Sequence, residues 1–168
     1  RHSRRELTVT CARAKVCESM IRDRCAVFGT YAPGEDVARL TFFALFALQH
    51  RGQESSGIVV SDGRELRRHV GGGLVSQVFD EASLSHLRGF SAIGHNRYST
   101  TGSSNVANAG PLVVSGPAGS LAVAHNGNIV NAQELRRELE EKGFQFHTTT
   151  DSEVIANLIL ASPGRDWI

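Results

Sequence analysis

The chain has 168 residues, of which 40% are apolar and 21% charged, and its formal net charge is +1. This composition predicts one ordinary globular domain with a real core and excludes a disordered or fibrous chain. The near-zero charge provides no basic face for nucleic acid. The longest apolar run, Phe42 to Leu48, is far shorter than the roughly 20 residues of a membrane-spanning helix.

The two ends of the chain differ from its middle. Residues 1–24 are rich in arginine and lack the apolar run of a secretory signal. We expect them to be a flank or propeptide, followed by a folded domain over residues 25–168. Residues 161–168 stop just past a helical pattern, which predicts a domain that is incomplete on its C-terminal side.

The first predicted elements are a strand and a helix. Cys25 opens a short apolar segment that predicts a strand, closed by the turn signal Pro33-Gly34. Asp36 can cap a helix over residues 37–49. Because that helix is apolar on nearly all sides, we expect it to lie between two layers.

A run of short strands separated by glycine-rich turns is predicted next, over residues 57–60, 65–70, 92–95, 112–115 and 121–125. Asn131 with Glu134 indicates a capping box for a helix that ends at Gly143, and Thr150 with Glu153 repeats this pattern before a last helix. The order of strand, helix, several strands and two helices favours an α+β layered sandwich over alternating parallel βαβ units.

Four segments are more particular than a core requires: C-A-V-F-G from Cys25, H-R-G-Q-E-S-S-G from His50, G-H-N-R-Y-S-T from Gly94 and H-N-G-N from His125. Taken singly, each is a weak signal. Asn-Gly is typical of a hairpin turn, an isolated arginine usually lies on a surface or in a salt bridge, and a histidine is more often hydrogen-bonded than catalytic.

Together with T-T-T-D-S-E-V from Thr148, these segments occur in the order and at about the spacing of class II glutamine amidotransferases. The chain resembles that family, whose members are N-terminal nucleophile hydrolases, from Cys25 to Leu160. The segments L-Q-H-R-G-Q and S-S-N-V are similar to the amidophosphoribosyltransferase branch. The resemblance implies a four-layer αββα sandwich.

The implied activity has two halves. This domain would hydrolyse glutamine to glutamate and ammonia. A phosphoribosyltransferase domain, absent from this chain, would use the ammonia to make 5-phosphoribosylamine from phosphoribosyl pyrophosphate in the first step of de novo purine synthesis.

Amide hydrolysis needs a nucleophile, a base and donors for the oxyanion. If Cys25 is the first residue of the mature protein, its α-amine, with an ordinary pKa of about 7.7 to 8.0, can accept the thiol proton at neutral pH. The resemblance assigns the oxyanion hole to the Asn126 side chain and the Gly127 backbone N–H. Catalysis is therefore expected from Cys25, Asn126 and Gly127.

The resemblance also assigns the residues that bind glutamine. Arg97, aided by Thr100, would bind the α-carboxylate, and Asp151 would bind the α-ammonium group. Arg51 and Gly52 would shape the surroundings of Cys25. The structural alternative for Asp151 is a helix N-cap, and both roles can hold at once because a side chain at a helix start faces the site that it frames.

The resemblance implies no metal and no cofactor in this chain. Full-length family members use Mg²⁺ at the phosphoribosyltransferase site, and some carry a 4Fe-4S cluster. The expected partners are glutamine here and phosphoribosyl pyrophosphate through the missing domain, without nucleic acid or membrane. We expect a homo-oligomer when the protein is full length, and a cytoplasmic location because the three cysteines show no disulfide spacing.

Other interpretations remain open at this point. The chain could be a non-catalytic, truncated or unprocessed remnant in which the Cys25 nitrogen is an amide and cannot act as a base. It could belong to another class II amidotransferase. A papain-like hydrolase would pair Cys25 with a histidine at position 50, 95 or 125. A metal site using Cys11 and Cys17 fits no structural zinc spacing.

Overall fold

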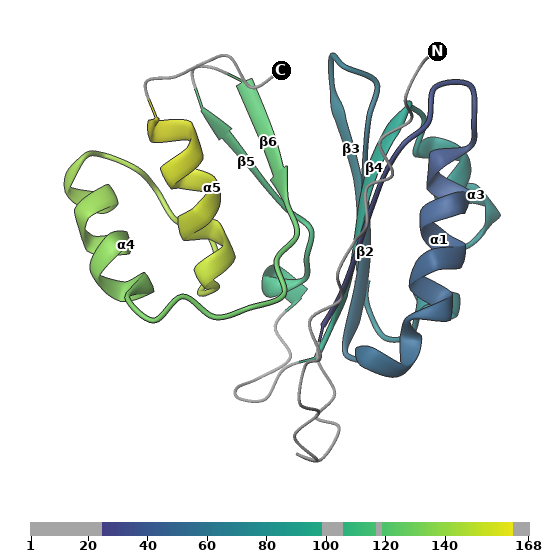
Figure 1. The fold of residues 1–168 in the computed structure, drawn as a ribbon, viewed down its shortest axis with the longest axis horizontal. Coiled ribbons are helices and arrows are strands. Elements are labelled where there is room, and N and C mark those ends of the chain that lie inside the picture. Colours follow the sequence, from purple (N-terminus) through teal and green to yellow (C-terminus); the bar gives the residue numbers. More distant parts are fainter. Residues whose placement is uncertain (1–24, 99–105, 117–118, 163–168) are drawn as a thin grey trace, which may run out of the picture.

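The computed structural model describes residues 25–98, 106–116 and 119–162, which form four layers in the order helices, sheet, sheet, helices (Figure 1). This is the layered α+β arrangement that the sequence predicts. The flank over residues 1–24, with Cys11 and Cys17, and the proposed substrate residue Thr100 lie outside the described residues.

The larger sheet is antiparallel, with strand order β1-β4-β2-β3. Its strands are β1 (Ala26–Tyr31), β2 (Ser55–Ser61), β3 (Leu66–Gly72) and β4 (Ser91–Arg97). In β4, Asn96 faces the helical layer, where its amide donates to the Leu45 carbonyl at 2.8 Å. Since side chains alternate along a strand, His95 and Arg97 face the second sheet.

Helix α1 (Val37–Ala47) covers the outer face of this sheet, and Asp36 caps it as predicted by accepting from the Arg39 N–H at 3.0 Å. Gly94 permits the close approach, because a Cβ there would lie 2.6 Å from Thr41 Cγ2. The expectation that α1 lies between two layers is wrong for the described chain. Its outer residues Leu40, Phe43 and Phe46 are 45%, 64% and 54% exposed.

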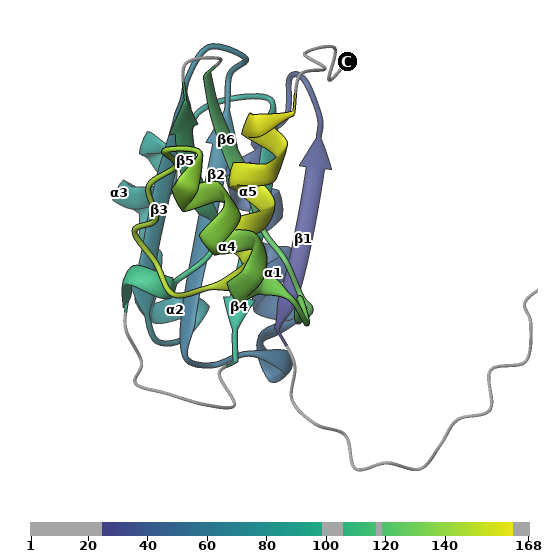
Figure 2. The ribbon, with the colours of Figure 1, turned by 90° about the vertical axis from the view of Figure 1, so that its left-hand side faces the viewer.

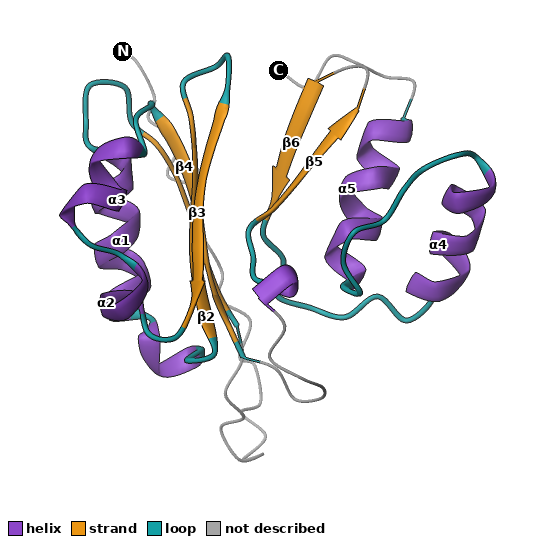
Figure 3. Ribbon diagram, turned by 180° about the vertical axis from the view of Figure 1, so that it is seen from behind, coloured by secondary structure: helices purple, strands orange, loops and turns teal. Residues whose placement is uncertain are grey.

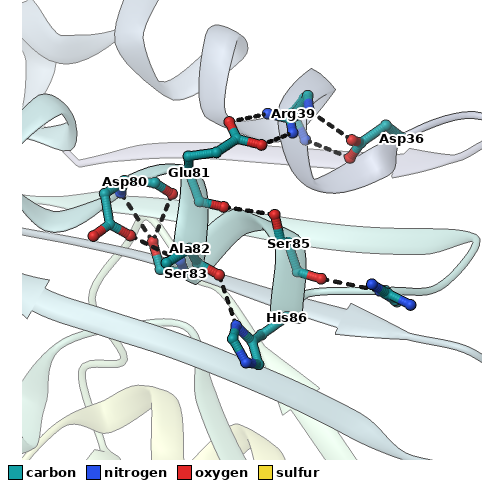
Figure 4. Close-up of polar contacts among 9 residues, drawn as sticks. Asp36, Arg39, Asp80, Glu81, Ala82, Ser83, Ser85 and His86 are labelled. Atoms are coloured by element: carbon teal, nitrogen blue, oxygen red, sulfur yellow. Dashed lines mark hydrogen bonds and ion pairs between the residues drawn. The ribbon is translucent and has the colours of Figure 1, made fainter.

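Two short helices, α2 (Val75–Val78) and α3 (Glu81–His86), were not predicted. Each is too short to show a helical periodicity in the sequence. Arg39 of α1 donates hydrogen bonds to Glu81 at the start of α3 (Figure 4), and these bonds hold the pKa of Glu81 below its usual range. The contact joins α3 to α1 on the same face of the sheet.

The second sheet is the hairpin of β5 (Leu112–Gly116) and β6 (Gly119–Val123). Helix α5 (Asp151–Ala161) covers its outer face and α4 (Ala132–Glu141) packs on α5 (Figures 2 and 3). The two sheets are joined through Arg68, which donates to the carbonyls of Ala109 at 2.8 Å and Pro111 at 2.9 Å. Two 3₁₀ turns, η1 (Gln49–Arg51) and η2 (Val106–Asn108), precede β2 and β5, respectively.

The predicted capping boxes of α4 and α5 are wrong in detail. Neither Asn131 nor Thr150 makes a side-chain cap hydrogen bond. Glu153, which is buried, instead accepts from the backbone N–H groups of His147 and Thr148, both at 2.7 Å. The glutamate therefore fixes the loop before α5 rather than the first turn of the helix. Among the described helices, none is both long and apolar enough to cross a membrane.

Candidate active site

A cavity of about 620 Å³ lies where the start of β1, the end of β4, the segment after β6 and the start of α5 meet. It brings together distant parts of the sequence that include four of the eight proposed site residues. The proposed site residues in its wall are Cys25, Arg97, Gly127 and Asp151.

Cys25 lies directly before β1 and is partly buried. Its sulfur is 3.5 Å from the Tyr98 backbone N–H, which donates to it, and 3.7 Å from the Tyr98 carbonyl. Arg51 approaches the Cys25 carbonyl with its Nε at 3.5 Å. Gly52 allows the turn that carries Arg51 to pack on β4, because a Cβ at Gly52 would lie 2.8 Å from the Asn96 carbonyl oxygen.

Asn126 reaches Cys25 from the segment after β6, and Gly127 lines the cavity beside it in the sequence. The Asn126 side-chain amide donates to the Cys25 carbonyl at 2.8 Å. An amide NH₂ has two donors, so one N–H remains for a ligand. A Cβ at Gly127 would lie 2.5 Å from His125 Nε2, so a side chain at position 127 would displace the His125 ring. Neither residue has a positive φ, which excludes the type I′ hairpin turn that Asn-Gly alone would predict.

Arg97 and Asp151 place opposite charges in the wall of the same cavity. Arg97 donates through Nη1 to the Asn108 carbonyl, which leaves other N–H donors of its guanidinium for a carboxylate. Asp151 is the first residue of α5 and accepts from the Ile129 N–H at 2.8 Å. It is therefore not the N-cap, and it ties α5 to the segment that carries Asn126.

His95 is a buried residue in the wall of this cavity. It is 7% exposed, and neither ring nitrogen has a hydrogen-bond partner within the described structure. Burial, then the positive charge of Arg97, then His125, lower its pKa to about 4. His125 Nδ1 lies 3.4 Å from Ser152 Oγ and 3.9 Å from Asp151 Oδ1.

A papain-like pair requires a histidine within hydrogen-bond reach of the nucleophile. The Cys25 sulfur contacts the Tyr98 backbone, and none of the histidines in the described ranges hydrogen-bonds to it. His50 is directed to the Ala47 carbonyl at 3.2 Å. Across the same ranges, no group of three or more His, Cys, Asp or Glu residues could hold a metal ion.

Sequence reasoning missed several contacts at the site. Tyr98 and Ile129 act through backbone atoms, which any residue supplies, so no sequence pattern could identify them. Asn108 lines the cavity and is hydrogen-bonded to Thr149. Its only sequence signal is an asparagine in a loop, which is typical of any turn.

Comparisons with known proteins agree with this geometry. The family model for the glutamine amidotransferase domain matches residues 95–168. The amidophosphoribosyltransferase of Synechococcus elongatus is 54% identical over 147 residues, covering 86% of this chain and 30% of the relative. The amidophosphoribosyltransferase of Bacillus subtilis is 46% identical over 143 residues, which cover 84% of this chain and 30% of the relative.

Solved structures give the same result. The structure of glutamine phosphoribosylpyrophosphate amidotransferase from B. subtilis, complexed with ADP and GMP, superimposes with a TM-score of 0.73 and 45% identity. The aligned region covers 82% of this chain and 30% of the B. subtilis chain. The chain belongs to the glutamine amidotransferase family. The four-layer fold is thus that of an N-terminal nucleophile hydrolase, and the papain-like interpretation is wrong. The chain spans about 30% of the length of the curated relatives that it matches.

Proposed function

We propose that this amidotransferase domain hydrolyses glutamine to glutamate and ammonia, with Cys25 as the nucleophile once residues 1–24 are removed. One observation carries the proposal. A single cavity is lined by a cysteine, by Gly127 with its backbone N–H, and by a pair of opposite charges, Arg97 and Asp151. Amide hydrolysis of a zwitterionic amino acid needs each of these groups.

The charged pair defines the substrate. An arginine fork can form two parallel hydrogen bonds with an α-carboxylate, and a carboxylate can accept from an α-ammonium group. Arg97 and Asp151 are assigned these two roles. Two N–H donors are assigned to bind the side-chain amide oxygen of glutamine. They are the Asn126 amide, which lies at the Cys25 carbonyl, and the Gly127 backbone N–H.

The reaction then follows from the residues present. The α-amine of a terminal Cys25 takes the thiol proton, and the thiolate attacks the amide carbon of glutamine. Asn126 and Gly127 stabilise the resulting oxyanion, at roughly 3 kcal/mol for each donor. The carbon–nitrogen bond breaks as the ammonium returns the proton to the departing ammonia. Water then cleaves the thioester, which releases glutamate and restores the thiol.

The second half of the activity is also proposed by similarity. The relatives are named amidophosphoribosyltransferases, so we infer that the ammonia is used by a phosphoribosyltransferase domain of the longer protein. Phosphoribosyl pyrophosphate, Mg²⁺ and, in some relatives, an iron–sulfur cluster would belong to that part. A homo-oligomeric, cytoplasmic enzyme of purine synthesis is the corresponding proposal for the whole protein.

The test uses the chain with Cys25 as its first residue, incubated with glutamine. We expect release of glutamate and ammonia, and covalent labelling of Cys25 by a diazo-ketone analogue of glutamine. Cys25→Ser should abolish both, because a hydroxyl is a much poorer nucleophile than a thiolate at neutral pH. A folded, processed chain that does neither would favour the alternative of a non-catalytic remnant.

A further inference from the structure

Asn108 hydrogen-bonds both to Arg97 and to the loop that leads into Asp151. Its carbonyl accepts from Arg97 Nη1. Its side-chain Nδ2 donates to Thr149 Oγ1 at 3.0 Å, and its Oδ1 accepts from the Thr149 N–H at 3.2 Å. Asn108, Arg97, Thr149 and Asp151 all line the cavity, so this bridge is part of its wall.

The two charged residues come from different layers. Arg97 ends β4 in the larger sheet, whereas Asp151 begins α5 on the outer side of the second sheet. The loop before α5 is held at His147 and Thr148 by Glu153, and at Thr149 by Asn108. Asn108 thus links the residue that carries one charge to the loop that leads to the other.

The separation between Arg97 and Asp151 matters because the two charged groups of the substrate also lie at a fixed distance from each other. The α-carboxylate and α-ammonium groups of an amino acid share one carbon atom, so their spacing is set by covalent geometry. Two protein charges can hold both groups at once only if their own separation matches that spacing. If Arg97 and Asp151 stood at the wrong spacing, they would bind only one of the two charged groups of the substrate.

We propose that the Asn108 side chain is a positioning residue that sets the spacing between Arg97 and Asp151 and thereby selects a free α-amino acid as substrate. The inference rests on the proposed function of those two residues. The bridge can be broken selectively, since its link to Arg97 is made by the backbone and its link to Thr149 by the side chain. Asn108→Ala removes only the second link.

The experiment compares two reagents that both label Cys25 of the chain that begins at Cys25. The diazo-ketone analogue of glutamine carries the α-carboxylate and α-ammonium groups, whereas iodoacetamide carries neither. Asn108→Ala should weaken the apparent affinity for the diazo-ketone roughly tenfold, because Arg97 and Asp151 would no longer hold both of its charged groups at once. The limiting rate of Cys25 labelling by the diazo-ketone should not change, and neither should the rate of labelling by iodoacetamide.

Matched variants locate the effect in the Asn108–Thr149 contact. Thr149→Val, which removes the hydroxyl but keeps the N–H, should give a smaller loss, and Thr149→Ser should restore wild-type affinity. Combining Asn108→Ala with Thr149→Val should be no worse than Asn108→Ala alone. Asn131→Ala is the control, because Asn131 is exposed and makes no cap hydrogen bond.

The outcomes separate this inference from the function on which it rests. If iodoacetamide labels the wild-type chain but the diazo-ketone does not, the proposed function fails. If the diazo-ketone labels the wild type and Asn108→Ala equally well, the function stands and the positioning role is overturned. Equal slowing by both reagents would show a merely structural role and would also overturn it.

Discussion

At the scale of single residues, Asn126 reaches Cys25 from the segment after β6, and its contact with the Cys25 carbonyl places an N–H donor beside the nucleophile. Asn126→Ala should lower kcat for glutamine hydrolysis by roughly 100-fold with little change in KM. The reason is that an oxyanion donor acts on the transition state rather than on the bound substrate. Steady-state kinetics of the processed chain measure this, and a rise in KM alone would contradict the role.

Arg97 offers a test of substrate recognition. Arg97→Lys keeps the positive charge but loses the planar fork that matches a carboxylate. The KM for glutamine should rise about tenfold or more, while iodoacetamide should alkylate Cys25 at the wild-type rate. Parallel loss of both reactions would indicate misfolding and not a carboxylate-binding role.

His95 makes a prediction about stability and pH. Its pKa falls to about 4 on folding, so the unfolded chain takes up the proton first. The protein therefore loses stability as the pH falls from about 6.5 toward 4, by at most about 3 kcal/mol from this group. Urea unfolding at pH 7 and pH 4.5 should show a smaller loss of unfolding free energy for His95→Gln than for the wild type. Identical losses of unfolding free energy would mean that folding does not lower the pKa of His95.

At the scale of elements, the loop before α5 depends on one buried carboxylate. Glu153 accepts three hydrogen bonds at 2.7 Å, from the His147 and Thr148 N–H groups and the Thr148 hydroxyl. A glutamine offers one oxygen and turns an NH₂ group toward these donors.

Glu153→Gln should consequently lower the free energy of unfolding by about 2 kcal/mol, as leaving buried groups unpaired does. Denaturant unfolding measures the change. The matched control is Glu140→Gln on the exposed side of α4, where the ion pair with Arg136 is half exposed and should be worth less than about 1 kcal/mol. Similar effects of the two substitutions would argue against a special role for Glu153.

At the scale of the whole molecule, the proposed chemistry requires a free amine on Cys25. We predict that the active protein from its native source begins at Cys25, with residues 1–24 removed. Intact-mass measurement and N-terminal sequencing check this. An active protein that retains Arg24 would contradict the role of the α-amine as the base, because an amide nitrogen cannot accept the thiol proton.

The sequence by itself determined the elements that have strong local signals. The Asp36 cap, the apolar strands and the two C-terminal helices follow from patterns of a few residues, and the structure contains them. The ordered blocks around Cys25, Arg97, Asn126 and Asp151 indicated the family because they match its motifs in order and spacing. The short helices α2 and α3 were missed, since four or six residues hold too little periodicity.

Only the tertiary structure decided how these residues meet. Asp151 looked like a cap and is instead tied to Ile129, and Glu153 holds a loop rather than its own helix start. Whether the outer side of α1 is covered depends on what packs there, which no helical pattern encodes. The Asn108 bridge joins residues that are 41 positions apart, and such contacts depend on the packing of whole layers, not on local sequence.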